Sequence, residues 1–184
     1  MTPALWVRID DRLLHGQVTV AWRQHLLPDE IWIVDDMVRA DPFLVDVLRM
    51  AAPADVTVRV YSVQEAISAW SALLRSPIFH SSDLPAFQPS DLPTSQSLCL
   101  LLLVKNPQTA LALFDGDVLF SHLNVGNIAP GPGSRRVFRT ISLTPEHVAA
   151  LDALTQRGVT VAFQLIPDDP QIDWQTVRQR HPNL

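Results

Sequence analysis

The sequence contains a single cysteine, no excess of basic residues and no long apolar run. The lone Cys99 excludes an internal disulfide and any metal site built from several cysteines. The formal net charge of −5 provides no basic footprint of the kind that nucleic-acid binding requires, so we expect no nucleic-acid partner. The longest apolar run, Leu98 to Val104, is far too short to span a bilayer.

Other signals are absent too. The N-terminus lacks the basic start of a signal peptide and leads directly into an apolar segment, so we expect a cytoplasmic protein. Neither a Walker sequence nor a dinucleotide-binding glycine pattern occurs, which disfavours an α/β nucleotide-binding enzyme. No two histidines have helical metal-ligand spacing, and we expect neither a metal nor another cofactor.

What is present is the composition of a globular protein. Apolar residues make up 47% of the 184 residues and charged residues 18%, which predicts one domain over 1–184 with a substantial core. Residues 76–97 break this pattern, because they hold four prolines, six serines and no glycine. We interpret 76–97 as a surface insertion that joins a helix to a strand. It should lie at the edge of the sheet away from His15.

Short apolar segments alternate with segments of helical periodicity. We predict strands at 5–9, 30–34, 56–61 and 98–104, a strand that begins at 118–120, and a last strand at 159–165. We predict helices at 17–25, after Asp41–Pro42 with an inward stripe of Phe43, Val47 and Met50, after Ser62, after Asn106–Pro107, and within 142–156. This alternation predicts an α/β fold with an open, mostly parallel sheet and helices on both faces.

Polar residues follow the predicted strands. In such a sheet, ligands bind beyond the carboxyl ends of the strands, so the polar residues there are the candidates for chemistry. They are Asp10, Asp11, Arg12 and His15 after the first strand, Asp35 and Asp36 after the second, Ser62 after the third, Lys105 and Asn106 after the fourth, and Asn124 and Gly126 after the fifth. For Asp35, Asp36 and Asn106 a plain helix-capping role is the competing interpretation.

The first of these loops carries the strongest chemical signal. His15 stands just before a predicted helix N-terminus, where backbone N–H groups and the helix dipole favour phosphate. Gly16 leaves room for close approach, and Arg12 offers a planar fork suited to phosphate oxygens. Asp10 or Asp11 can fix the tautomer of His15, so that the other ring nitrogen is the nucleophile.

This loop resembles the phosphorylation loop of the IIB components of the mannose/fructose/sorbose-type sugar phosphotransferase system. The resemblance covers nearly the whole chain outside 76–97. It is carried by 7–18 (VRIDDRLLHGQV), 20–22, 33–36, 40–43, 50–53, 105–107 and 123–126. It implies a protein-N(π)-phosphohistidine–sugar phosphotransferase with an open α/β fold, in which His15 accepts a phosphoryl group from a IIA component.

The resemblance also implies the partners. The phosphoryl group passes from His15 to a sugar carried by the membrane components IIC and IID, and these would bring the protein to the inner face of the membrane. The sugar then meets this protein only through the membrane partner, and a homo-oligomer stays compatible with the sequence.

We assign the site residues accordingly. Asp10 orients the imidazole of His15, Arg12 together with Arg8 balances the phosphate charge, and backbone groups around Gly16, Gln17 and Val18 hold the phosphate oxygens. The predicted rim consists of Asp11, Asp35, Asp36, Lys105, Asn124 and Gly126.

The sequence departs from the family pattern after Asn124-Val125-Gly126. The family there has a second glycine and a methionine, whereas this chain continues with Asn127 and Ile128. Two alternatives stay open: a regulatory relay protein that uses the same histidine without feeding a transporter, and a degenerate binding module. The intact run from Asp10 to Gln17 argues against the second.

Overall fold

The structure is a computed structural model that describes residues 3–75 and 98–184. The expected insertion at 76–97 therefore lies outside the described residues. The strands are β1 (Ala4–Asp10), β2 (Glu30–Val34), β3 (Thr57–Tyr61), β4 (Cys99–Val104), β5 (His122–Asn127), β6 (Arg135–Phe138), β7 (Ile141–Leu143), β8 (Thr160–Phe163) and β9 (Ile172–Asp173). The helices are η1 (Gln17–Trp22), α1 (Arg23–Leu26), α2 (Asp36–Arg39), α3 (Pro42–Met50), α4 (Val63–Arg75), α5 (Pro107–Asp115), α6 (Pro145–Gln156) and α7 (Trp174–Arg180).

The main sheet has the strand order β3-β2-β4-β1-β5-β8-β9 within the described part of the chain. Every neighbouring pair whose register is described is parallel except β8–β9, which is antiparallel. The fold class expected from the sequence is thus confirmed. The parallel arrangement brings the carboxyl ends of β1, β2, β3, β4, β5 and β8 to one edge, which we call the active edge.

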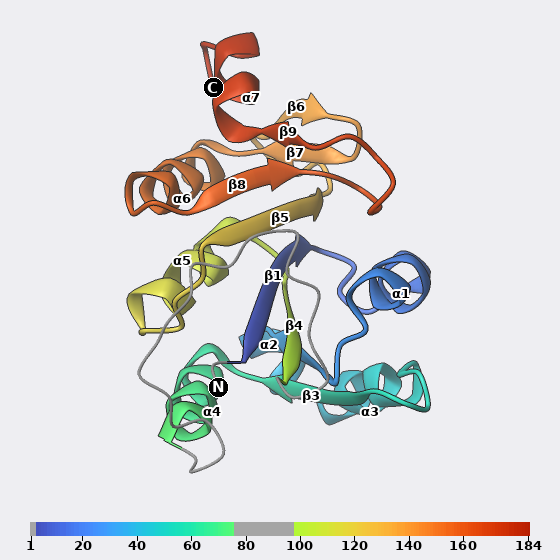
Figure 1. The fold of residues 1–184 in the computed structure, drawn as a ribbon. Helices are drawn as coiled ribbons and strands as arrows, with labels where there is room; N and C mark the ends of the chain where they lie inside the picture. Colours follow the sequence, from blue (N-terminus) through green and yellow to red (C-terminus); the bar gives the residue numbers. More distant parts are fainter. Residues whose placement is uncertain (1–2, 76–97) are drawn as a thin grey trace.

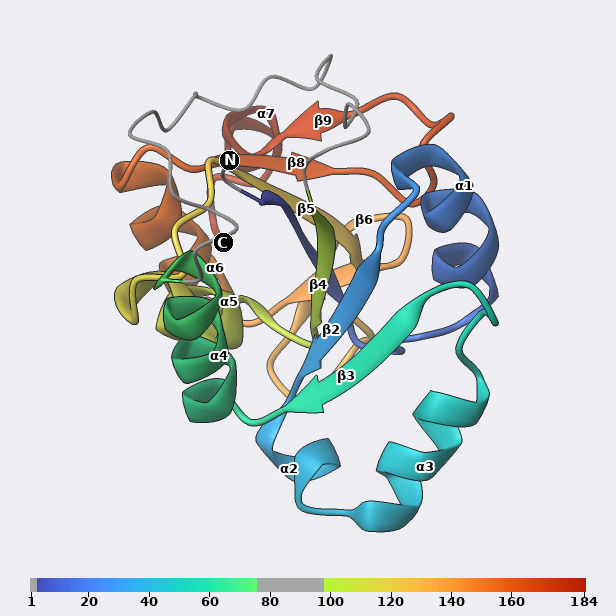
Figure 2. The ribbon, with the colours of Figure 1, turned by 60° about the horizontal axis from the view of Figure 1, so that its bottom comes forward.

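Side chains of the central strands alternate between two separate cores. On β4, Leu100, Leu102 and Val104 face one core, whereas Leu101 and Leu103 face the other, as the period of two in a strand requires. Helices α4, α5 and α6 cover the first face, and η1, α1, α2 and α3 cover the second. Figures 1 and 2 show α4, α5 and α6 on the side of the sheet opposite α1 and α3.

The apolar stripe predicted to face inward on α3 is wrong. Phe43 and Met50 are 72% and 86% exposed, and Val47 is exposed as well, whereas Val45 is buried. Asp41 caps the helix as predicted, because its carboxylate accepts from the backbone N–H groups of the first turn. The helix therefore starts where expected, but it turns a different face toward the sheet.

Strand β5 begins later than predicted. Residues 118–120 belong instead to the connection that follows α5, where the Val118 N–H donates to the Leu113 carbonyl and Asp117 adopts a left-handed conformation with φ 66°. The strand starts at His122 and extends to Asn127.

The carboxyl-terminal part contains elements that the sequence did not reveal. The hairpin β6–β7 and the segment β9–α7 are short, and they lack the longer periodic patterns on which the predictions relied. The strand predicted at 159–165 and taken as the last is β8, which ends at Phe163. Gln164 and Leu165 leave the strand at the active edge.

The first helix occupies the predicted residues but is not a plain α-helix. Gln17–Trp22 form a π-helix, and one α-helical turn, Arg23–Leu26, completes it. π-Helical turns are rare and often occur at functional sites. Here the π-helix begins two residues after His15, with Gly16 between them.

Candidate active site at the end of β1

Strand β1 presents two charged side chains on one face. Val7 and Ile9 belong to the first core, so Arg8 and Asp10 point to the opposite face, where η1 packs. Arg8 lies beside Asn124 in the parallel register of β1 and β5. Strand pairing thus places a residue of β5 next to the charged pair of β1.

The loop after β1 is anchored on both sides of a tight turn. The Leu13 N–H donates to the Asp10 carbonyl at 2.8 Å, and Leu13 takes a left-handed conformation with φ 55°. Leu13 and Leu14 are buried in the second core, and that packing holds this strained turn in place. His15 follows at the start of η1, with its side chain 18% exposed.

The hydrogen bonds of His15 define its tautomer. Nε2 lies 2.9 Å from Asp10 Oδ2, and because an ionised carboxylate only accepts, Nε2 carries the proton and donates. The Gln17 N–H points to Nδ1 at 3.4 Å, so Nδ1 is the unprotonated nitrogen. A lone pair on Nδ1 is therefore directed at the start of the helix.

Asp10 collects positive charge while fully buried. Its carboxylate accepts from Arg8 Nη2 at 2.9 Å and from Arg12 Nε at 2.9 Å, in addition to His15. Burial by itself raises the pKa of Asp10, but the hydrogen bonds from His15 and Arg12 and the charge of Arg8 outweigh it, and they hold that pKa well below its usual range. Asp10 is therefore ionised at neutral pH.

Arg12 lies at the open side of the site. Besides Asp10, its Nη2 donates to Gln17 Oε1 at 3.0 Å, and its side chain is 40% exposed. The guanidinium stands next to His15 without being enclosed.

Arg8 does not lie where a phosphate ligand would. Its side chain is 1% exposed, and it bonds to Asp10, Asn124 and the carbonyls of Gln164 and Leu165. Burial lowers the pKa of Arg8 to about 10, against the opposing influence of Asp10, and the group stays charged at neutral pH. This geometry supports a role behind Asp10 rather than the predicted contact with phosphate.

The predicted backbone donors differ in availability. The Val18 N–H already donates to the His15 carbonyl at 2.9 Å, so it is engaged within the helix and not directed at the ring. The Gln17 N–H faces Nδ1, and a Cβ added at Gly16 would meet no atom within 4 Å. The space around Gly16 and Gln17 is therefore open to a group bound on Nδ1.

The predicted rim separates into two groups. Asp11 accepts from Asn127 Nδ2 and from the Ala129 N–H, so it ties the loop after β5 to β1 close to the site. Asn124 and Gly126 adjoin Arg8. The other three make structural contacts: Asp35 caps α2 and pairs with Lys105 at 3.4 Å, and Asp36 accepts from the Val63 N–H at 2.9 Å.

Sequence reasoning missed Gln164 and Trp22. Gln164 is 5% exposed, and its carbonyl accepts from Arg8 at 3.1 Å. The Trp22 ring lies 4.8 Å from Arg8 Cζ, and its Nε1 donates to the Leu165 carbonyl at 3.0 Å. Gln164 is a polar residue that follows β8. The criterion used for the other candidates, a polar residue at the end of a strand, would therefore have identified it.

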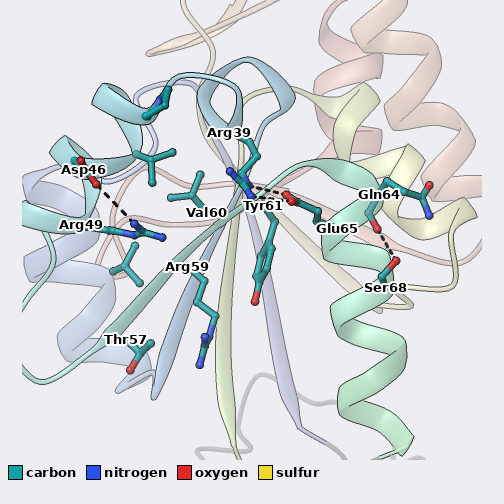
Figure 3. Close-up of a pocket in the computed structure, with 13 residues that line it drawn as sticks. Arg39, Asp46, Arg49, Thr57, Arg59, Val60, Tyr61, Gln64, Glu65 and Ser68 are labelled. Carbon is teal, nitrogen blue, oxygen red and sulfur yellow. Dashed lines mark hydrogen bonds and ion pairs between the residues drawn. The ribbon is translucent and has the colours of Figure 1, made fainter.

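A groove of about 670 Å³ lies away from His15, along the edge strand β3 between α3 and α4 (Figure 3). Its arginines are engaged by carboxylates, in the pairs Arg39–Glu65, Arg49–Asp46 and Arg59–Glu30. Among residues 3–75 and 98–184, no cluster of histidine, cysteine and carboxylate side chains fits a metal ion, and no helix has the length and apolarity to cross a membrane.

Comparisons with known proteins identify the family of this chain. The family model described as "PTS system sorbose subfamily IIB component" matches residues 4–79 and 91–183. The sorbose-specific EIIB component of Klebsiella pneumoniae is 30% identical over 90% of this chain and 89% of its own length. The mannose-specific EIIAB component of Escherichia coli is 28% identical over 90% of this chain, which covers 45% of that protein.

The fold leads to the same group. The crystal structure of the IIBSor domain of the Klebsiella pneumoniae sorbose permease superposes with a TM-score of 0.80 and 27% identity, covering 97% of this chain and 98% of that one. The family match extends over nearly all of the chain outside residues 80–90. This chain therefore belongs to the sorbose-subfamily IIB components of the sugar phosphotransferase system, which are phosphoryl-transfer components of sugar transport.

Proposed function

We propose that this protein carries the phosphoryl group on Nδ1 of His15, which it receives from a phosphorylated IIA component. From there the group passes to a sugar presented by IIC and IID in the membrane. The observation that carries the proposal is the tautomer of His15, in which Asp10 binds Nε2–H and Nδ1 is the unprotonated nitrogen that can attack phosphorus. The side chain of His15 is 18% exposed, which suits a group that two partners must reach in turn.

In the proposed reaction, Nδ1 forms a bond to phosphorus as the bond to the donor's histidine breaks. The ring of His15 gains positive charge in this step, because Nε2 keeps its proton. The Asp10 carboxylate, 2.9 Å from Nε2, stabilises that charge without any rearrangement. In transfer to the sugar, a hydroxyl oxygen forms a bond to phosphorus as the Nδ1–phosphorus bond breaks, the hydroxyl proton passes to solvent, and His15 returns to its neutral form.

Arg12 supplies the positive charge that faces the phosphoryl oxygens. In the resting site its guanidinium rests on Asp10 and Gln17, and its exposure leaves it free to turn toward a group on Nδ1. The Gln17 N–H and the open space at Gly16 complete the predicted phosphate site at the start of η1.

The choice of IIA as donor rests on the family. The mannose-specific relative is named EIIAB, so IIA and IIB parts occur in one chain there. The relatives named above are components of sugar systems, which favours transport over a purely regulatory relay.

The test is a phosphorylation assay with phosphoenolpyruvate, the general phosphocarriers and the IIA part of the Escherichia coli mannose protein. We expect acid-labile phosphate on the wild type and on His25→Ala, which changes an exposed histidine of α1, but none on His15→Ala. Correlation of ³¹P with ¹⁵N-labelled imidazole should place phosphorus on Nδ1. Persistent labelling of His15→Ala would refute the assignment.

A further inference from the structure

The Arg8 guanidinium lies in a buried socket behind the active site, formed by Asn124, Trp22 and the carbonyls of Gln164 and Leu165. Nη1 donates to Asn124 Oδ1 and to the Gln164 carbonyl, and Nη2 donates to the Leu165 carbonyl at 3.1 Å. The Trp22 indole covers one face of the guanidinium. The socket is thus assembled from β5, the end of β8 and the π-helix η1, and its opening faces Asp10.

Gly126 creates the space for this guanidinium. A Cβ added at Gly126 would overlap Cζ, Nη1 and Nη2 of Arg8, well inside van der Waals contact. The other atoms around Arg8 include backbone carbonyls of the chain segment after β8, which have little freedom to move. Any side chain at position 126 must therefore displace Arg8.

The socket acts on His15 through one shared oxygen. Asp10 Oδ2 accepts from Arg8 Nη2 and from His15 Nε2, each at 2.9 Å. A displacement of Arg8 removes the partner that fixes this oxygen from behind. Arg12 then becomes the remaining arginine on Asp10, because its Nε binds Oδ1 at 2.9 Å and its Nη2 binds Oδ2 at 3.1 Å, and its exposed side chain can draw the carboxylate away from His15.

Stability alone does not account for a buried pair of this kind. Replacing a buried ion pair by well-packed apolar residues is often neutral or stabilising, so burial of Arg8 with Asp10 is weak evidence for a purely structural role. The direction of the pair is more telling, because the oxygen that Arg8 holds is the one that binds the reactive imidazole.

We propose that Asn124 and Gly126 are positioning residues for phosphoryl transfer, which act through Arg8 and Asp10 to keep His15 in the Nε2–H tautomer. This inference rests on the proposed function of His15 and adds two residues of β5 that never touch the phosphoryl group. Asn124 holds the guanidinium from the side, and Gly126 leaves it room.

The first test compares Gly126→Ala with Gly131→Ala. Both glycines lie in the β5–β6 region, but a Cβ at Gly131 would meet nothing within 4 Å, and neither glycine has a positive φ. We expect Gly126→Ala to lower the maximal rate of transfer from phosphorylated IIA by on the order of 10- to 100-fold, the usual effect of a misplaced reactive group. KM for IIA should stay unchanged, because the socket is buried, and Gly131→Ala should behave as wild type.

The second test measures the tautomer directly, without any phosphoryl donor. In ¹⁵N NMR spectra of labelled imidazole, the wild type and Gly131→Ala should show protonated Nε2 and unprotonated Nδ1 near neutral pH. Gly126→Ala and Asn124→Ala should show a mixture of the two tautomers. This measurement stays informative even if His15 were not the phosphorylated residue, so failure of the proposed function and failure of the positioning role are told apart.

Asn124→Ala decides the matter if Gly126→Ala does not fold, as judged by circular dichroism. It removes one partner of Arg8 and adds no bulk. A folded Asn124→Ala or Gly126→Ala with the wild-type tautomer would overturn the inference, and so would a folded variant with wild-type transfer rates. A slower rate together with a mixed tautomer would support it.

Discussion

Asp10 is the residue on which the charges of the site converge. Three cationic or proton-donating groups, from Arg8, Arg12 and His15, share a carboxylate that is fully shielded from solvent. Removing the shared carboxylate leaves the buried Arg8 uncompensated, which costs more than the arrangement contributes as a whole. Substitutions at Asp10 should therefore affect stability and transfer together.

We predict that Asp10→Asn lowers the free energy of unfolding by about 3–5 kcal/mol at neutral pH, because Arg8 stays buried without a counter-charge. Urea denaturation measures this loss. The pKa of Asp10 is depressed below its ordinary value of 3.8 in the folded state, so its contribution is complete above that pH and is lost as the pH falls further. The difference between wild type and Asp10→Asn should therefore stay constant from pH 6 to about pH 4 and narrow as the pH falls below 3.8, and a difference that does not narrow there would contradict this pKa shift.

Arg12 should matter for rate far more than for stability. Because its side chain is partly exposed and Asp10 keeps Arg8 without it, Arg12→Ala should unfold close to the wild-type midpoint. Transfer from phosphorylated IIA should slow by about 10²-fold or more, as for the loss of other groups that stabilise developing charge.

Arg12→Lys should recover only part of that rate, because lysine keeps the charge and loses the planar fork. The matched control is Arg180→Ala, which removes an exposed arginine of α7. The rate of phosphoryl transfer is measured on samples of the reaction that are stopped at successive times. Near-normal transfer by Arg12→Ala would assign the phosphate charge to another residue.

Among the secondary-structure elements, α3 shows how packing overrides an apparent sequence stripe. The helix has apolar residues on more than one side, and Val45 rather than Phe43 contacts the second core. Counting the apolar residues along the helix cannot show which of these two residues is buried. The buried face depends on how the α2–α3 turn docks on β3.

This orientation makes a paired prediction. Val45→Ala should destabilise the protein by roughly 1–3 kcal/mol, because it leaves a cavity in a packed core. Phe43→Ala should change stability by no more than about 0.5 kcal/mol, as expected for an exposed site. Thermal or urea denaturation of both variants measures these changes in stability. A larger loss of stability for Phe43→Ala than for Val45→Ala would reverse the assignment of the buried face.

For the molecule as a whole, strand pairing separates the chain flanking 76–97 from the active edge. Cys99 pairs with Ala4, at the start of β1, whereas Asp10 lies at its end. Six residues of strand separate these points by roughly 20 Å, at about 3.3 Å per residue. The chain therefore re-enters the sheet at the edge opposite His15.

We predict that replacing residues 79–94 with a short linker leaves phosphorylation by IIA intact, because loop length contributes little to the free energy of folding. The same assay with phosphoenolpyruvate measures it, and His15→Ala in the shortened chain should again remove the label. Loss of phosphorylation in a folded shortened chain would mean that this segment reaches the active edge.

The features predictable from the sequence are those that depend on neighbouring residues. The caps of α3, α4, α5 and α6 follow from Asp41, Ser62, Asn106 and Thr144, whose side chains bond to the first turn of the helix that each begins. The parallel sheet follows from the alternation of apolar and helical segments, and β4 is buried along its whole length as its continuous apolar run indicated. The caps are local interactions, and the parallel class of the sheet follows from the order of the elements, so both can be recognised without knowing which strands pair.

The sequence by itself also determined which side chains meet at the end of β1, since Asp10, Arg12 and His15 lie within six positions and the turn between them is short. Only the tertiary structure decided the role of Arg8, because its partners Asn124 and Gln164 lie 116 and 156 residues away along the chain. Their approach depends on which strands pair and in which register. Strand pairing is a long-range choice that no local pattern encodes, and it turns an arginine that resembles a phosphate ligand into the buried support of the carboxylate that orients His15.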